Sequence, residues 1–512
     1  MNNLNFLVDV LKESPVFKTL EKNVKPGRTV CASGLSTINK SNIIYALCRL
    51  KGVTAFCLAS DEKEAQTLCN DLSCMGLRSY VYPVRDFNFL DFQSRSHEYE
   101  HARLKVLLKL INHECDVAIA CVDAAAQLTV PRNVLEQSVI EFEEGSELSL
   151  EKATKALTLL GYERFDAVEG SGQFSLRGGI LDFFMPDSDY PVRCEFWGDE
   201  ITDLSYFDIE TQRRFKKADK ITLSPSTEIV IEDRAALADK IEHKAKLLRS
   251  KNSAKAKEKL FSEAELIRSG AMIANADKFI NQIYDKPESL FDYLDRNTLV
   301  FASEFTAIQE RGKSMDFISN ETLMQGFEDG TLCRGFDRFA LTFNECTEFL
   351  QSHGTIVLEN FVHGSMPIKL SEIISFSTKQ LSAWGGSYKQ LKEDVDGLFT
   401  PESKGVIFAG TERAAKNLCD TFNADGINAV YSEGADKISK GELLVMQGAL
   451  SAGFEYPSQK FFCNNLQSGF VPSRKVQKER RKRRDRKFTA FQSLPQVIML
   501  YTMFTVSVCS EV

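Results

Sequence analysis

The chain has 512 residues, 43% of them hydrophobic and 26% charged, and carries a formal net charge of −8. At ~150 residues per domain, this length predicts about three or four domains that each bury a core. The composition excludes a wholly disordered or collagen-like chain, and the acidic balance excludes a uniformly basic, histone-like protein.

The N-terminal segment lacks the charged region and apolar core of a secretory signal. Thirteen cysteines are scattered along the chain without short paired spacings, and Cys69 and Cys74 come nearest to a pair. This distribution of cysteines predicts free thiols in the reducing cytoplasm.

Residues 29–128 alternate short apolar runs with stretches of helical spacing. This alternation predicts an α/β fold with a parallel, doubly wound sheet, in a first domain at 1–130. The predicted strands lie at 29–34, 53–60, 78–83 and 115–122, and the clearest helices lie at 41–50 and 62–76.

A smaller α+β domain is predicted at 131–214. A helix at 150–160 is followed by segments that alternate at period two, which is typical of antiparallel strands. Gly178 and Gly179 break the first of these segments, and Pro186 ends it.

The remainder divides by composition into four parts. A mostly helical part is expected at 215–350, with one strand at 299–303, and a second α/β domain at 351–468. A basic linker follows at 469–494, then an apolar tail at 495–512. In the second α/β domain, strands are predicted at 355–360, 405–410, 428–434 and 442–448, and a helix is predicted at 411–426.

Three segments resemble motifs of catalytic or nucleotide sites. His97, Glu98 and His101 fit HExxH, but zinc needs a third ligand and none stands out, which favours a solvated helix start over a zinc hydrolase. Residues 307–314, which include Lys313, fit a loose P-loop pattern within a charged, helical segment. We expect a surface helix there rather than an NTPase loop.

The third motif follows the first predicted strand. Gly34, Asn39, Lys40 and Ser41 stand at the GxxxxGK[ST] positions, with Asn39 in place of the second glycine. Asp123 closes the strand at 115–122, but no second acidic residue follows to hold magnesium. We predict a P-loop fold that has lost nucleotide; weak phosphate binding through Lys40 and Ser41 is the alternative.

Five segments resemble the bacterial transcription-repair coupling factors, in the part of those proteins that is homologous to UvrB. The second α/β domain of these factors, absent from UvrB, supplies the last of the five. The segments are 172–178, 182–184, 193–201, 207–213 and 448–457.

The resemblance implies that the first domain is a vestigial, RecA-like motor domain and that 131–214 docks UvrA, the damage-recognition protein of nucleotide excision repair. The docking positions fall at Arg177, Arg193 and Trp197. Arginines beside an aromatic side chain are typical of interface hot spots. Alternatively, both arginines pair with Glu195 and Asp199 on a solvated sheet face.

Full-length factors continue into a module that binds RNA polymerase and then into motor domains that use ATP and magnesium to move on double-stranded DNA. This chain is expected to recruit UvrA without a cofactor and without hydrolysing ATP, as a truncated factor. A P-loop NTPase or a zinc hydrolase is the alternative.

The basic run at 474–487 has ten Lys or Arg and two acidic residues, and suits either nucleic acid or a solvated linker. The tail after Leu494 departs from the family pattern. The codons that can encode these residues also allow the family's continuation to be read in another frame. This predicts a frameshift after Leu494. A membrane anchor is the rival, although polar residues interrupt the 23 uncharged residues at 488–510. We expect no membrane contact.

Overall fold

The computed structural model describes residues 4–85, 97–249, 253–270, 276–362, 366–381 and 388–465. The described residues lie in one compact unit, Met1–Leu466. The basic run at 474–487 and the tail at 495–512, for which alternative interpretations were given above, lie outside the described residues.

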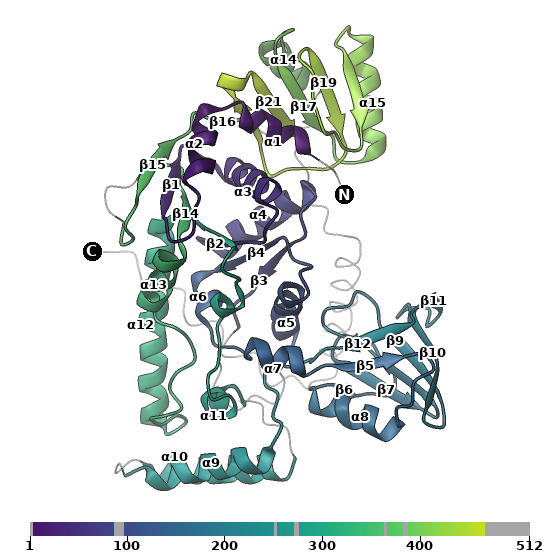
Figure 1. Cartoon of the computed structure of the whole chain (residues 1–512), viewed down its shortest axis with the longest axis vertical. Helices are drawn as coiled ribbons and strands as arrows, with labels where there is room; N and C mark the ends of the chain where they lie inside the picture. The colour runs from purple at the N-terminus through teal and green to yellow at the C-terminus, as the bar shows by residue number, and fades with distance from the viewer. Residues whose placement is uncertain are drawn as a thin grey trace, which may run out of the picture. The chain divides into compact units, whose positions relative to one another are not determined.

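A seven-stranded parallel sheet forms the largest core (Figure 1). Its strand order is β15-β1-β14-β13-β2-β4-β3, and every neighbouring pair is parallel. The predicted parallel, doubly wound α/β fold is confirmed. The strands are β1 (Val30–Ser33), β2 (Ala55–Ala59), β3 (Ser79–Tyr82), β4 (Val117–Cys121), β13 (Leu299–Ser303), β14 (Thr355–Leu358) and β15 (Glu372–Ser375).

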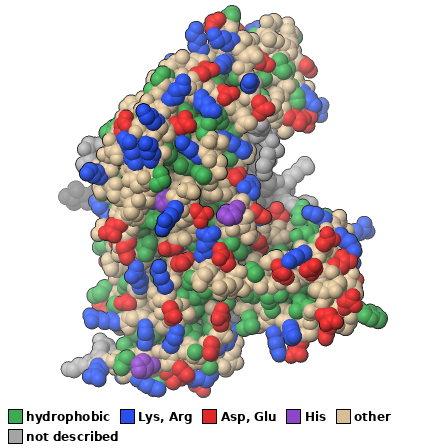
Figure 2. All heavy atoms as spheres, in the orientation of Figure 1, with side chains coloured by type: hydrophobic (Ala, Val, Ile, Leu, Met, Phe, Trp, Pro, Cys, Tyr) green, Lys and Arg blue, Asp and Glu red, His purple; other side chains and the backbone are tan. Residues whose placement is uncertain are grey.

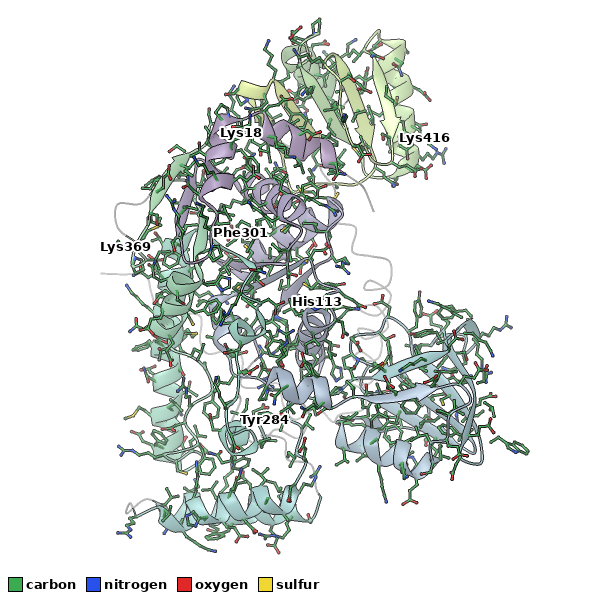
Figure 3. All side chains as sticks on the ribbon, in the orientation of Figure 1. Lys18, His113, Tyr284, Phe301, Lys369 and Lys416 are labelled. Carbon is green, nitrogen blue, oxygen red and sulfur yellow. The ribbon has the colours of Figure 1, made fainter. Side chains whose placement is uncertain are left out.

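Helices cover both faces of this sheet, because its strands are apolar on both sides. Val30 and Ala32 of β1 pack into one hydrophobic cluster, whereas Cys31 packs into the opposite one. Phe301 of the central strand β13 is fully buried in the first cluster (Figure 3). One face carries α1 (Asn5–Lys12), α2 (Pro15–Asn23), α3 (Thr37–Lys51) and α4 (Glu62–Cys74). The other carries α5 (Glu98–Ile111), α6 (Val122–Ala126), α7 (Arg132–Gln137), α12 (Phe305–Asp329) and α13 (Phe343–His353).

The strand prediction for 355–360 assigned this segment to the wrong sheet. β14 pairs in parallel with β1 on one side and with β13 on the other, in the middle of the first sheet. A short apolar run shows that a strand is buried, but it does not show which sheet buries it. The predicted domain boundaries, including that at 350, stay predictions.

The second sheet has six strands in the order β11-β10-β9-β8-β7-β6, with the predicted helix present as α8 (Leu150–Leu159). Apart from the short parallel pair β6–β7, the strands are antiparallel, as predicted for the α+β domain. A separate antiparallel pair, β5 (Ile140–Glu143) with β12 (Lys220–Leu223), was not predicted. The six strands are β6 (Glu163–Arg164), β7 (Gln173–Arg177), β8 (Ile180–Phe183), β9 (Val192–Trp197), β10 (Glu200–Phe207) and β11 (Arg214–Lys217).

A helical hairpin follows, in which α9 (Arg234–Leu247) packs along α10 (Ser253–Arg268). Tyr284 joins this part to the preceding domain, since its hydroxyl donates to the Glu228 carbonyl over 3.0 Å and accepts from the Val230 amide over 2.8 Å (Figure 3). The segment continues through α11 (Ile280–Ile283) and two short 3-10 helices, Ala276–Phe279 and Leu290–Tyr293.

The last sheet has the order β16-β20-β21-β17-β19-β18, with a parallel core and antiparallel pairs at one edge. The second α/β pattern is thus confirmed at β17, α15, β18 and β19, whereas β20 and β21 were not predicted. Its elements are β16 (Lys379–Leu381), α14 (Tyr388–Leu398), β17 (Lys404–Phe408), α15 (Glu412–Ala424), β18 (Ala429–Ser432), β19 (Glu442–Met446), β20 (Gly453–Tyr456), the 3-10 turn Pro457–Gln459 and β21 (Phe461–Asn465).

The cysteines in the described ranges are free, and eleven of these twelve are buried. Burial raises the pKa of the Cys31 thiol to about 12, which disfavours the reactive thiolate. Among the described residues, no helix is both long enough and apolar enough to span a bilayer.

Candidate functional site

The degenerate P-loop is closed by the chain itself. Gly34 has φ +79°, and a Cβ there would lie 2.2 Å from the Phe376 carbonyl oxygen, so only glycine fits. The Gly34 and Leu35 amides donate to the carbonyls of Asn360 and Glu359. In a working P-loop such amides bind phosphate, whereas here protein carbonyls occupy them.

Lys40 is buried, and protein acceptors surround its ammonium group. Nζ lies 2.7 Å from Glu304, 2.8 Å from the Ser303 hydroxyl and 3.2 Å from Glu64. Since an ammonium has three protons, these three contacts use its full donor capacity. Burial alone would raise the pKa of Glu64, but the Lys40 charge and hydrogen bonds from Ser303 and Ser60 lower it.

Asn39 is fully buried within α3, which begins at Thr37, so this position belongs to a helix rather than to a flexible loop. The Ser36 hydroxyl donates to the Asn39 side-chain oxygen over 2.7 Å. Ser41 stands at the serine position of the motif, and its hydroxyl donates to the Asp71 carboxylate over 3.4 Å.

Asp123, after β4, also has an internal partner. Both of its carboxylate oxygens accept from the Arg311 guanidinium, over 2.9 and 2.7 Å. The lysine, serine and carboxylate positions of this motif are therefore all engaged within the protein. The residues present do not fit ATP with magnesium.

Asp71 connects α4 to the segment 448–457. Its carboxylate accepts from the Ser451 amide and hydroxyl, each over 2.7 Å, and the Asn42 amide donates to the Tyr456 hydroxyl over 3.1 Å. Burial raises the pKa of Asp71 to about 6. Through Asn42 and Asp71, α3 and α4 therefore pack against the 448–457 segment.

The other two motifs do not form the sites that they resemble. His97 Nδ1 contacts Glu100 over 2.9 Å, and the His101 ring packs against Gly172. Within the described ranges, no cluster of three or more His, Cys, Asp or Glu side chains could hold a metal. Lys313 lies within helix α12, where Gly312 makes room for the Phe343 ring, so the helix predicted at 307–314 is confirmed against the alternative of an NTPase loop.

The predicted docking residues share the outer face of the six-stranded sheet. In the sheet register, Asp182 of β8 is opposite Arg193 of β9 and opposite Ser175 of β7. Arg177 follows Ser175 by two residues and therefore lies on the same face. Arg177 contacts Asp182 over 2.8 Å, and Arg193 contacts the same carboxylate over 2.7 and 2.8 Å. One buried acid thus holds both arginines.

Exposure distinguishes the three residues. The Arg177 side chain is 52% exposed and Trp197, at the β9–β10 turn, is 82% exposed, whereas the Arg193 side chain is 13% exposed. The Arg193 guanidinium lies over the Phe207 ring at 4.4 Å and donates to the Gln212 carbonyl. Its hydrogen bond with Asp182 raises the pKa of Arg193.

The alternative in which Arg177 and Arg193 pair with Glu195 and Asp199 is wrong. Asp182 pairs with both arginines, and Glu195 instead pairs with Arg214. The alternation of strand side chains does not say which of several nearby acids an arginine reaches. Figure 2 shows acidic and basic side chains mixed over the visible face of this domain.

Residues 140–229, which include this sheet, match the family model of the UvrB interaction domain. The chain contains a UvrB interaction domain. The matched region begins at β5 and extends beyond β12, the pair that the sequence prediction missed.

Over most of its length the chain is similar to proteins named transcription-repair-coupling factor, which confirms the resemblance. It is 27% identical to the Bacillus subtilis protein over 88% of this chain and 39% of the relative. The Staphylococcus epidermidis protein is 25% identical over 79% and 35%, and a Staphylococcus aureus protein is 22% identical over 94% and 41%. The chain spans about two fifths of the length of these curated relatives.

A buried charge network that sequence reasoning missed anchors the end of the interaction domain. Arg103 of α5 is fully buried and contacts Glu228 over 2.6 and 3.3 Å, and Thr129 donates to Glu228 over 2.7 Å. Glu100 accepts from the Glu228 amide over 2.8 Å. The only signal in the sequence was Arg103 itself, a charged residue among the apolar positions of α5. An arginine on a solvated face of the helix would give the same signal.

Proposed function

We propose that the interaction domain of this chain docks UvrA, and that the chain acts in the recruitment step of transcription-coupled nucleotide excision repair. The observation that carries the proposal is that Arg177 and Trp197 are both exposed on one face of the sheet. That face lies in the region that matches the UvrB interaction domain, and the relatives named above are called transcription-repair-coupling factors. Exposed arginine and tryptophan side chains on one face are typical of binding hot spots.

Within this function, Arg177 and Trp197 contact UvrA, and Asp182 with Arg193 position Arg177. The low exposure of Arg193 supports this division, because its guanidinium already has a carboxylate, a carbonyl and an aromatic ring as neighbours. A residue with so little free surface contributes mainly through the neighbour that it holds.

We further infer that the described part of the chain acts as an adaptor that neither binds nor hydrolyses ATP. The internal pairing of Lys40 and Asp123 supports this inference. Binding of RNA polymerase and of double-stranded DNA are properties that we propose for the whole factor rather than for these residues.

Binding of purified UvrA to the full chain tests the proposal. Trp197→Ala should weaken UvrA binding by about 30-fold, because truncation of a hot-spot tryptophan costs about 2 kcal/mol. Phe317→Ala is the matched control, since Phe317 is also an exposed aromatic residue but lies on α12. Equal loss in both variants, or no binding by the unchanged chain, would refute UvrA docking through this face.

A further inference from the structure

A cleft of about 680 Å³ lies between the C-terminal end of α9, the start of α10 and the loop that follows α12. We name it the hairpin cleft. It is separate from both the degenerate P-loop and the interaction domain, and no motif in the sequence indicates it. Its volume is within the ~300–1,000 Å³ that is typical of ligand pockets.

The floor of the hairpin cleft is apolar. Leu248, Phe327, Leu332 and Cys333 line it, and Leu247 at its edge is 60% exposed. An exposed leucine beside an apolar floor leaves hydrophobic surface in water, which a partner would cover favourably.

Close packing defines the wall formed by the end of α12. A Cβ at Gly326 would lie 2.7 Å from the Leu332 side chain, so the helix and the returning loop approach closely. Gly330 ends α12 with φ +69°, which turns the chain back toward the α9–α10 hairpin. The floor residues are therefore held by the fold before any partner binds, which lowers the entropic cost of binding.

The rim of the hairpin cleft is basic. Lys244, Arg249 and Arg334 line it, and the described lining residues include no Asp or Glu. The Lys244 ammonium donates to the Gly335 carbonyl over 3.1 Å and lies 5.1 Å from the centre of the Phe336 ring. Neither of these neighbours carries a negative charge. The Asp337 carboxylate, which accepts from the Gly335 amide over 3.1 Å, lies close to the rim, but the three cations outnumber it, so the rim attracts an acidic partner.

We propose that the hairpin cleft binds an acidic, amphipathic helix of a partner protein. Apolar side chains at i, i+4 and i+7 would cover the floor, and carboxylates on the flanks of that helix would meet the three cations of the rim. The apolar floor favours a peptide over nucleic acid, because a phosphate backbone has no hydrophobic face to place against Leu247 and Leu248.

The probe is a fluorescent peptide of about 18 residues, with leucines at helical spacing and glutamates elsewhere. Fluorescence anisotropy measures its binding to the full chain. Arg334→Glu and Leu247→Glu should each weaken binding at least about tenfold, because one reverses a rim charge and the other places a carboxylate against the floor. Lys313→Glu and Leu159→Glu are the matched controls, since both residues are exposed elsewhere, and they should leave binding unchanged.

Hydrogen exchange supplies a second measurement on the same samples. Bound peptide should slow amide exchange at 244–249 and 327–335 and leave the interaction domain unchanged. A peptide in which every glutamate is replaced by lysine should not bind.

Three results would overturn the proposal. The first is absence of binding by the acidic peptide, or equal binding by the cleft variants and the controls. The second is displacement of the bound peptide by duplex DNA, which would assign the cleft to nucleic acid. The third is dissociation of a dimer by Leu247→Glu in sedimentation, which would show that a second copy of the chain covers the floor.

Discussion

Lys40 and Arg177 are basic residues at two predicted sites, and their surroundings differ in one decisive respect. The Lys40 side chain is 2% exposed, with two carboxylates and a hydroxyl around it, whereas Arg177 is 52% exposed and has one carboxylate contact. The buried cation has no donor left for a ligand, and the exposed one retains most of its guanidinium for a partner. A motif residue therefore indicates function only when its charge is still available.

Carboxylates show the same contrast. Near the degenerate P-loop, burial raises the pKa of Glu359 to about 7, with the neighbouring Glu304 adding to the effect. On the docking face, Asp182 is also buried but contacts two arginines. The first region uses its charges to hold segments of the first sheet together, and the second uses a buried charge to hold two cations at the surface.

Lys40→Ala should produce the largest effect. Removal of the ammonium leaves Glu64 and Glu304 without their common cation, and breaking a buried ion pair costs about 3–5 kcal/mol. The free energy of unfolding in urea measures this loss. Lys313→Ala, at an exposed lysine, should change it by less than about 0.5 kcal/mol. An unchanged unfolding midpoint for Lys40→Ala, or a melting temperature of the unchanged chain that rises with ATP, would contradict internal neutralisation.

The pH dependence of stability examines the contact between Asp71 and Ser451. Burial raises the pKa of Asp71 from 3.8 to about 6, so the folded state binds a proton more tightly than the unfolded state does. Stability is then highest below about pH 4 for this group and falls as the pH rises to about 6, by at most about 3 kcal/mol. Glu359 acts in the same direction up to about pH 7.

Asp71→Asn should remove its share of that pH dependence, as measured by urea unfolding at a series of pH values. Asp9→Asn is the control, because Asp9 is exposed on α1. A slope that Asp71→Asn leaves intact would show that Asp71 is not the titrating group.

Asp182→Asn should have a smaller effect on stability and a selective effect on docking. Loss of the charge that Arg177 and Arg193 share should cost about 2 kcal/mol of unfolding free energy. UvrA binding should weaken about tenfold, because Arg177 loses its fixed orientation. The control is Glu151→Gln, since Glu151 pairs with Lys155 on α8 of the same domain and such surface pairs contribute little to stability. Equal binding by the two variants would remove the positioning role of Asp182.

Much of the fold could be predicted from the sequence, because short apolar runs separated by amphipathic helices have few alternative structures. β1 to β4, α8 and β17 to β19 lie where the pattern predicted them, whereas β20 and β21 were not predicted. The assignment of β14 to a sheet could not be predicted, since its pairing with β1 connects residues more than 300 positions apart. The β5–β12 pair is likewise held together by long-range contact.

The candidate site could be predicted in part. The family motifs predicted docking positions at Arg177, Arg193 and Trp197. These three residues lie on one sheet but differ in exposure. Asp182 as their common partner could not be predicted, because register and side-chain reach decide which acid an arginine contacts. Weak phosphate binding through Lys40 remained an alternative at the level of sequence, because Ser303 and Glu304, which surround its ammonium group, are distant from it along the chain.

The most direct test of the account is the affinity of the full chain for UvrA after reversal of charge at Arg177. Arg177→Glu should weaken binding more than about 100-fold while the unfolding midpoint stays near that of the unchanged chain, because the side chain is half exposed. Arg177→Ala should weaken binding less, and Arg164→Glu, at an exposed arginine of the same domain, should leave it unchanged. UvrA binding by a folded Arg177→Glu chain with unaltered affinity would contradict docking through this face.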